Sequence, residues 1–294
     1  MIDPAIKLVA IIGPTASGKS DLALALAQRY TGEIMCADSR TVYRGLDIGA
    51  AKPSPADRAL IPHHLLDLVD PDQTLSVAAF KQAAEMAIGQ ITARKHVPFL
   101  VGGSGLYLDS ILYDYQFPSE ADYSLRAELD ELSSDELLGR LQIVDPKAYG
   151  SIDMSNRRRV SRAIETAGQV RGRTNKLRGS TIVIGMAMNK EVIQQRIDLR
   201  IKNMLKEGFF DEVKVLGAKY GWDNEAMSGI GYRAFQAASE GRMTVDEAAK
   251  EFARGDMRLV KKQLTWFRRN KAIHWVSSQA EAEELVGNFL ECAV

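Results

Sequence analysis

Cysteine is scarce in this sequence of 294 residues, which contains only Cys36 and Cys292. Two cysteines cannot make a disulfide framework or a four-cysteine zinc site, and they suggest a reducing compartment. Long apolar runs are missing too, since none approaches the roughly 20 residues that span a bilayer. The amino terminus lacks the layout of a signal peptide. We therefore expect a cytoplasmic protein without a membrane partner, and we expect a monomer.

An excess of charge of either sign is also absent, because 38 lysines and arginines balance 38 aspartates and glutamates. Without a net charge, no overall field attracts nucleic acid or a membrane, so a polyanionic partner would need a local basic patch. What remains is an ordinary globular composition, with 46% hydrophobic and 26% charged residues, 23 Gly and 9 Pro. This composition excludes the collagen-like and disordered classes.

Short apolar strands alternate with helices along the chain. Strands are expected at 7–12, 33–37, 97–101 and 181–188, and helices at 18–29, 76–94, 190–219 and 244–270. This alternation predicts an α/β fold in which helices flank a parallel sheet. Parallel strands are covered on both faces, which accounts for unbroken apolar runs such as that of residues 7–12.

The region 114–178 has helical periodicity and no convincing strand. From Ser119 to Glu136 it holds seven acids and one base, and from Arg157 to Arg178 it holds eight bases and one acid. We expect a small all-helical insertion here, between the two parts of a phosphate-binding core at 1–113 and 179–294.

A second basic run falls on the last expected helix, with seven bases and one acid from Arg254 to Lys271. Leu264, Trp266 and Phe267 interleave this run and are expected to be core contacts. Either basic run alone would suit a solvated helix face. Two such runs in a neutral chain favour a groove for a polyanion.

The strongest motif is Gly13-Pro14-Thr15-Ala16-Ser17-Gly18-Lys19-Ser20. It fits the phosphate-loop (P-loop) pattern and lies between an expected strand and an expected helix. The backbone N–H groups of such a loop surround a phosphate at the amino end of the helix, where the helix dipole favours an anion. Lys19 would reach the terminal phosphate, and the Ser20 hydroxyl would bind Mg²⁺. A Gly-rich turn without a ligand is the alternative.

Two further loops follow expected strands. Strand 97–101 ends in Gly102-Gly103-Ser104-Gly105, which allows close approach of the backbone but supplies no carboxylate for ATP hydrolysis. Asp38 follows strand 33–37. Since the carboxyl ends of parallel strands line one crevice, Asp38 should face the P-loop as a Mg²⁺ ligand or general base. A capping or turn aspartate is the alternative.

Two adjacent histidines, His63 and His64, are the one other feature that could suggest a metal site. Their spacing suits neither a pair of ligands on one helix face nor a catalytic triad without further partners. We expect them to form a loop or a packing pair.

The motifs resemble those of the tRNA dimethylallyltransferases, also called tRNA isopentenyltransferases. Matching segments occur in the family's order over nearly the whole chain. The block that begins ADSRTVY and the block KKQLTWFRR are far more specific than the P-loop. The segments are GPTASGKS (13–20), ADSRTVYRGLDIGAAKPS (37–54), HHLLDLVDP (63–71), PFLVGGSGLYL (98–108), RRRVSRAIE (157–165), QQRIDLRIKNMLKEGFFDEV (194–213), GIGYRAF (229–235) and KKQLTWFRR (261–269).

This resemblance implies a P-loop NTPase-like fold and a prenyl transfer. The dimethylallyl group of dimethylallyl diphosphate would move to N6 of the adenosine 3′-adjacent to the anticodon of a tRNA, and diphosphate would leave. The P-loop would then hold a diphosphate, with Mg²⁺ at Ser20. Asp38 matches the family's general base. Thr15 matches a hydroxyl placed against the bridging oxygen, and either Arg196 or Arg200 matches an arginine on the diphosphate.

The resemblance also implies contacts with the tRNA anticodon stem-loop, from which the target base would be extruded. The matching positions are Asp38, Ser39, Arg40, Thr41, Ser104, Arg126, Arg158, Arg159, Val160, Ser161 and Arg162. The chain departs from the family's pattern at Asp109 and in the segment after Glu165 (TAGQVRGRTNKLRGS), which lacks the usual Thr-Gly-Lys-Pro-x-Ser run.

Three other functions remain as alternatives. An adenylate isopentenyltransferase would prenylate a free nucleotide, but the expected insertion and the KKQLTWFRR block favour a polymeric substrate. A P-loop small-molecule kinase would be expected to carry a carboxylate after strand 97–101. A nucleic-acid-binding module with a vestigial P-loop would have no reason to keep Thr15, Lys19, Ser20 and Asp38 together.

Overall fold

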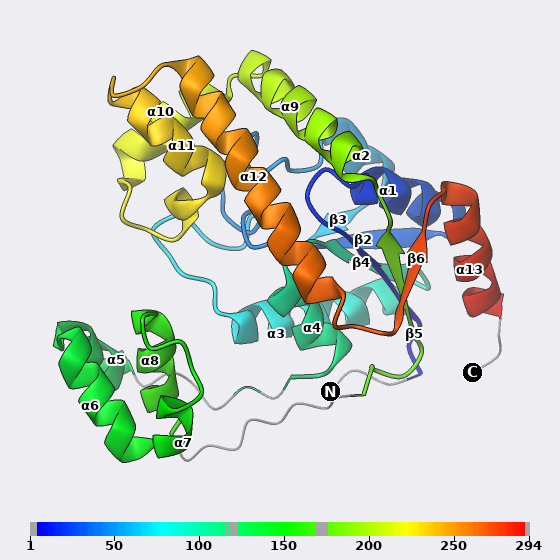
Figure 1. The fold of residues 1–294 in the computed structure, drawn as a ribbon. Coiled ribbons are helices and arrows are strands. Elements are labelled where there is room, and N and C mark those ends of the chain that lie inside the picture. The colour runs from blue at the N-terminus through cyan, green and yellow to red at the C-terminus, as the bar shows by residue number, and fades with distance from the viewer. Residues whose placement is uncertain (1–4, 116, 118–122, 168–175, 292–294) are drawn as a thin grey trace. The chain divides into compact units, whose positions relative to one another are not determined.

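The computed structural model describes residues 5–115, 117, 123–167 and 176–291 (Figure 1). The chain divides into two compact units. Unit 1 comprises Met1–Asp114 and Asn175–Val294, and unit 2 comprises Tyr115–Thr174. Each unit has a hydrophobic core of its own.

Six parallel strands form the sheet of unit 1, in the order β3-β2-β4-β1-β5-β6 (Figure 1). Every residue of the central strand β1 is buried, as its unbroken apolar sequence requires. The predicted α/β class with a parallel sheet is confirmed. The strands are β1 (Leu8–Ile12), β2 (Gly32–Ala37), β3 (His63–His64), β4 (Val97–Gly102), β5 (Thr181–Met186) and β6 (Ile273–Val276).

Helices cover both faces of this sheet. Leu8, Ala10 and Ile12 of β1 belong to one core, which includes residues of α3, α4 and α9, whereas Val9 and Ile11 belong to a second core with α1 and α13. None of the described helices is both long and apolar enough to cross a membrane. The helices of unit 1 are α1 (Lys19–Arg29), α2 (Pro55–Leu60), α3 (Val77–Ala93), α4 (Gly105–Leu112), α9 (Lys190–Lys206), α10 (Phe209–Tyr220), the 3₁₀ turn η1 (Ala226–Ser228), α11 (Ile230–Ser239), α12 (Val245–Phe267) and α13 (Gln279–Glu291).

Some elements differ from the expectation. The helix expected over 190–219 is interrupted at Gly208, whose φ of 99° favours glycine, so α9 and α10 are separate helices. His63 and His64, expected as a loop or a packing pair, form β3 and pair with Ile34 and Met35 of β2. The strand expected over 181–188 ends at 186. The sequence pattern predicts neither β6 nor α13.

Unit 2 is helical in its described residues. Its core consists of Leu129, Leu137, Leu141, Val160, Ala163 and Ile164. Ser133 and Asn156 accept backbone N–H bonds at the amino ends of α6 and α8. Residues 168–175, which hold much of the divergent segment after Glu165, lie outside the described residues. The helices are α5 (Tyr123–Glu131), α6 (Ser134–Val144), α7 (Pro146–Tyr149) and α8 (Arg157–Glu165).

Candidate active site

The P-loop joins the end of β1 to the start of α1. Its backbone is left-handed at Ala16 (φ 60°) and Gly18 (φ 82°), and α1 begins at Lys19. Within the described residues no side chain caps this helix end, so its first N–H groups can bind an anion. The Ser17 hydroxyl is buried against Gly13 and has no hydrogen-bond partner in the described part of the chain. The loop therefore has the polar groups that a phosphate requires.

Lys19 extends back over this loop. Its Nζ donates a hydrogen bond to the carbonyl of Pro14 at 3.2 Å. Burial lowers the pKa of Lys19 to about 8, the charge of Asp38 opposes this shift, and the charge of Arg200 adds to it. A phosphate bound in the loop would favour the charged form of Lys19. The influence of Asp38 on Lys19 also supports the expectation that this carboxylate faces the P-loop.

Thr15 is held at its backbone and at its side chain. Its N–H donates to Oε1 of Gln263 at 2.9 Å, and its hydroxyl accepts a hydrogen bond from Nη1 of Arg200 at 2.6 Å. Gln263 also donates from Nε2 to the carbonyl of Gly103 at 3.0 Å, so one α12 side chain joins the P-loop to the loop after β4. The sequence pattern alone indicates no role for Gln263, although the residue lies within the KKQLTWFRR block.

Both arginines that the sequence left as alternatives lie at the P-loop. Nη1 of Arg196 is 2.7 Å from the position that a Cβ atom on Gly18 would occupy. Arg200 contacts Thr15 and forms an ion pair with Asp256, a buried residue of α12. Burial raises the pKa of the Asp256 carboxyl, and Arg200 opposes that shift. Asp256 was not among the predicted site residues.

Asp38 follows β2 and stabilises a turn. Its Oδ1 accepts a hydrogen bond from the N–H of Arg40 at 2.8 Å, and its carbonyl accepts one from the Thr41 hydroxyl at 3.3 Å. The N–H of Ser39 donates to Oγ of Ser104 at 3.0 Å, which joins this turn to the loop after β4. The turn interpretation of Asp38 therefore has direct support, and it is compatible with a role at the P-loop.

The glycines after β4 allow these loops to approach. A Cβ atom at Gly102 would clash with the carbonyl of Ala37, and one at Gly103 would lie 2.5 Å from Gln263 Nε2. The expected close approach at these glycines is confirmed, and the group that approaches Gly102 is the backbone of β2 itself.

Two predicted tRNA contacts, Arg40 and Thr41, have partners inside unit 1. The Arg40 guanidinium donates to the carbonyls of Glu225 and Ala226, the latter at 3.4 Å. Thr41 is 6% exposed. Both side chains hold the turn in place; Thr41 is buried, whereas Arg40 remains half-buried.

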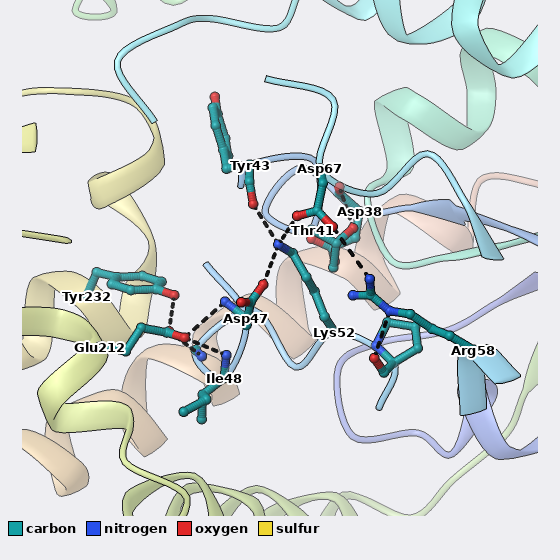
Figure 2. Close-up of polar contacts among 12 residues, drawn as sticks. Asp38, Thr41, Tyr43, Asp47, Ile48, Lys52, Arg58, Asp67, Glu212 and Tyr232 are labelled. Atoms are coloured by element: carbon teal, nitrogen blue, oxygen red, sulfur yellow. Dashed lines mark hydrogen bonds and ion pairs between the residues drawn. The ribbon is translucent and has the colours of Figure 1, made fainter. Parts of the chain in front are cut away.

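The buried side chain of Lys52 holds the loop that follows the Asp38 turn (Figure 2). The Lys52 side chain is 2% exposed, donates to the carbonyl of Tyr43 at 2.7 Å, and pairs with Asp47 at 2.7 Å and with Asp67. Arg58 also approaches Asp67, at 3.5 Å. A buried ammonium group needs such partners, because an unpaired one would be costly.

Glu212 of α10 supports the same chain segment (Figure 2). Its carboxylate accepts three backbone hydrogen bonds, from Asp47 at 3.0 Å, Ile48 at 2.8 Å and Gly49 at 2.9 Å. The Tyr232 hydroxyl donates to Oε1 at 2.6 Å. The specific motifs at 37–54 and 229–235 thus meet at this carboxylate.

Unit 2 uses several of its predicted tRNA-contacting residues internally. Arg126 donates to both carboxylate oxygens of Glu165, at 2.9 and 3.0 Å, and Arg162 donates to the same carboxylate at 2.7 Å. Val160 is 2% exposed. The expectation of an RNA contact is corrected for the Val160 side chain, because it lies on the inner face of α8. Arg158 and Arg159 are exposed on that helix.

The basic side chains of the second basic run, Arg254 to Lys271, are exposed along the second half of α12 and the turn that follows it. Basic side chains and an indole line a hollow of about 490 Å³ on this surface. The indole Nε1 of Trp266 donates a hydrogen bond to the Asp109 carboxylate at 3.0 Å. Asp109, where the sequence departs from the family's pattern, is therefore the partner of a residue in the KKQLTWFRR block. Phe267 is buried, as predicted for a core contact. The lining residues are Arg258, Lys261, Lys262, Thr265, Trp266 and Arg269.

Comparison with known proteins identifies the family. A family model described as IPP transferase matches residues 41–270. The chain belongs to the IPP transferase family. The matched range begins after the P-loop and Asp38, so the case for those residues rests on their sequence pattern and geometry.

Relatives of this IPP transferase family member cover nearly its whole length. The tRNA dimethylallyltransferase of Roseiflexus sp. (strain RS-1) is 43% identical over 276 residues, 90% of each chain. The tRNA dimethylallyltransferase 1 of Citrifermentans bemidjiense is 37% identical over 296 residues, 97% of each chain. These relatives confirm the resemblance predicted from the sequence.

Solved structures agree with this membership. The crystal structure of a full-length tRNA isopentenylpyrophosphate transferase from Bacillus halodurans is 35% identical to this chain, with a TM-score of 0.74 and 97% of each chain covered. A eukaryotic dimethylallyltransferase structure has a TM-score of 0.85 but is 23% identical, and it covers 97% of this chain and 79% of its own. That second likeness shows the fold alone.

Proposed function

We propose that this IPP transferase family member moves the dimethylallyl group of dimethylallyl diphosphate to N6 of the adenosine 3′-adjacent to the anticodon in tRNA. The observation that carries the proposal is the position of Thr15 in the P-loop. Its N–H is bound by Gln263, its hydroxyl accepts from Arg200 at 2.6 Å, and no side chain among the described residues caps the adjoining start of α1. Such a loop suits a diphosphate. The names of the relatives, tRNA dimethylallyltransferases, supply the acceptor class.

The transfer exchanges a carbon–oxygen bond for a carbon–nitrogen bond. The bond between the allylic carbon and the diphosphate oxygen breaks, and its electron pair stays on the diphosphate. The N6 lone pair forms the new bond, and N6 gives a proton to Asp38. Thr15 donates to the bridging oxygen, while Lys19 and the P-loop N–H groups stabilise the charge that develops on the leaving group.

Mg²⁺ fits the oxygen donors of this site. Ser20 lies in the first turn of α1, directly after Lys19, and its hydroxyl is the kind of hard oxygen donor that Mg²⁺ prefers. Among the described residues no group of three or more His, Cys, Asp or Glu could hold a metal. Mg²⁺ would neutralise charge on the departing diphosphate.

Two exposed basic surfaces would bind the anticodon stem-loop. One is the outer face of α8, with Arg158 and Arg159, and the other is the basic face of α12. Phosphate contacts of this kind position an RNA without reading its sequence. Reversal of Arg162 cannot test this binding, because Arg162 supports Glu165. The contact positions proposed for the RNA are Asp38, Ser39, Arg40, Thr41, Ser104, Arg126, Arg158, Arg159, Ser161 and Arg162, of which Arg40, Thr41, Arg126 and Arg162 also have the partners described above.

Mass spectrometry of nucleosides tests this function. Unmodified tRNA is incubated with the protein, Mg²⁺ and dimethylallyl diphosphate, and we expect N6-dimethylallyl adenosine. Asp38→Ala should abolish the product. Asp211→Ala, at an exposed acid of α10, should retain it.

Two outcomes would contradict the proposal. Product from free AMP but not from tRNA would indicate an adenylate isopentenyltransferase. If neither acceptor is modified, ATP turnover would distinguish a P-loop kinase from a nucleic-acid-binding module.

A further inference from the structure

Helix α12 presents two polar side chains to the P-loop region. Asp256 and Gln263 are seven residues apart, which places them on one face of the helix two turns apart. Gln263 binds the backbone N–H of Thr15, and Asp256 binds Arg200, which in turn binds the Thr15 hydroxyl. Asp256 is the one acid of the basic run from Arg254 to Lys271, and it is 3% exposed.

The geometry at Thr15 determines where its hydroxyl proton can go. A guanidinium group has five N–H donors and no acceptor. Since Arg200 donates to Oγ1 of Thr15, the Thr15 hydroxyl cannot donate its own hydrogen to Arg200 and can donate it to another acceptor. Gln263 already holds the backbone at this residue, so the remaining freedom of Thr15 is the rotation of its side chain.

We infer that Asp256 is a positioning residue that fixes the Arg200 guanidinium so that the Thr15 hydroxyl donates toward the leaving diphosphate. The inference rests on the proposed function and extends it to a residue that touches neither substrate. Arg200 has a long side chain with many rotamers, and the ion pair with Asp256 restricts them. Both groups are largely removed from water, with side chains 26% and 5% exposed.

Orientation and binding have different kinetic consequences here. A diphosphate would attract Arg200 whether or not Asp256 is charged, so ground-state binding should survive the loss of Asp256. The alignment of the Thr15 proton matters when the carbon–oxygen bond breaks. A group that acts only at that stage lowers kcat and kcat/KM together and leaves KM unchanged.

The test compares Asp256→Asn with Asp246→Asn. Asp246 is an exposed acid at the start of the same helix and serves as a matched control for loss of one charge. With tRNA and dimethylallyl diphosphate as substrates, we expect Asp256→Asn to lower kcat about tenfold, since small misplacements of reacting groups have effects of that order or larger. The KM for dimethylallyl diphosphate should change less than about twofold. Asp246→Asn should behave as the unaltered protein.

A double-variant cycle tests whether Asp256 acts through Thr15. In a Thr15→Ala background, Asp256→Asn should cause no further loss of kcat. An additive loss would overturn the inference, and so would an unchanged kcat for Asp256→Asn or a higher KM with normal kcat. Asp256→Glu keeps the charge but displaces it by one methylene, and it should also lower kcat. This variant provides the measurement if Asp256→Asn fails to fold.

The two proposals fail differently. If the unaltered protein transfers no prenyl group, the proposed function is wrong and the inference falls with it. If the unaltered protein is active and Asp256→Asn matches the Asp246→Asn control, the inference alone is wrong.

Discussion

At the start of β2, the carboxylate of Glu33 is buried among three basic side chains. Arg94 donates to both oxygens at 2.8 and 2.7 Å, and ring nitrogens of His64 and His96 lie 2.6 and 2.7 Å from them. The hydrogen bond from Arg94 lowers the pKa of Glu33 to about 2 against the effect of burial, with contributions from His64 and His96. This cluster joins β2 to β3 and to the start of β4, at the end of β2 opposite Asp38.

Glu33 should therefore contribute stability that depends on pH. Its pKa in the folded state, about 2, lies below its ordinary value of 4.5, so its contribution is complete above about 4.5 and is lost as the pH falls toward 2. We expect Glu33→Gln to lower the free energy of unfolding near neutral pH by about 2 kcal/mol. Urea unfolding along a pH series measures both effects.

The control for this prediction is Glu284→Gln, at an exposed glutamate of α13, which should change stability little. A difference between Glu33→Gln and the unaltered protein that stays constant from about pH 6 to about pH 3 would contradict the assigned role of the ionised carboxylate.

Elements with a strong local signal could be predicted from the sequence. The apolar runs gave β1, β2 and β4 to within a residue or two, and the P-loop motif marked the start of α1. Strand β6 has four residues with an exposed pair in the middle, and β3 has two residues, so neither carries a periodic pattern.

The contacts between elements could not be predicted in the same way. Gln263 meets Thr15 across 248 positions of sequence, and Asp256 meets Arg200 across 56. No local pattern encodes such a pairing, because it depends on how α12 packs over the sheet. The family resemblance marked the segment that holds Gln263 but did not identify its partner.

The loop between β2 and α2 is held by a long-range contact of the same kind, with a side chain of α10. Glu212 accepts backbone N–H bonds from three successive residues, Asp47 to Gly49. Glu212→Gln would turn an N–H donor of the amide toward those donors, and we expect it to lower the free energy of unfolding by about 3 kcal/mol. Tyr232→Phe removes one donor to the same carboxylate and should cost about 1 kcal/mol.

Chemical unfolding of the two variants checks this order. Glu207→Gln, at an exposed residue just before α10, serves as the control for the loss of charge. Equal losses for Glu212→Gln and Tyr232→Phe would show that the backbone contacts contribute little.

At the scale of the whole molecule, two features are the distribution of basic residues along the chain and the insertion of unit 2 into the sequence of unit 1. The chain is neutral, yet α8 carries four arginines and one acid, and the stretch from Arg254 to Lys271 carries seven bases and one acid; these two stretches belong to different units. Unit 2 is inserted between the two sequence segments of unit 1. The end of the first segment and the start of the second lie side by side, because the Arg178 N–H donates to the Leu112 carbonyl at 2.7 Å. The two ends are therefore close enough for a short connection.

Replacement of residues 115–174 by a short Gly/Ser linker should leave unit 1 folded, because both of its cores lie within it. We expect the shortened protein to bind dimethylallyl diphosphate with an affinity within about threefold of the full chain, and to lose tRNA affinity by about tenfold or more. Calorimetry and filter binding measure the two affinities. Unchanged tRNA affinity would show that unit 2 contributes no RNA contact.

The clamp of Gln263 on Thr15 has a consequence for the order in which the chain is made. Synthesis proceeds from the amino terminus, so Thr15 of the P-loop is made 248 residues before Gln263. Strand β1 also waits for β5, since Leu8 pairs with Thr181. A nascent chain therefore carries the complete phosphate-loop motif long before α12 can fix its threonine. A truncated product that ends before α12 would retain the signature of the site without its geometry.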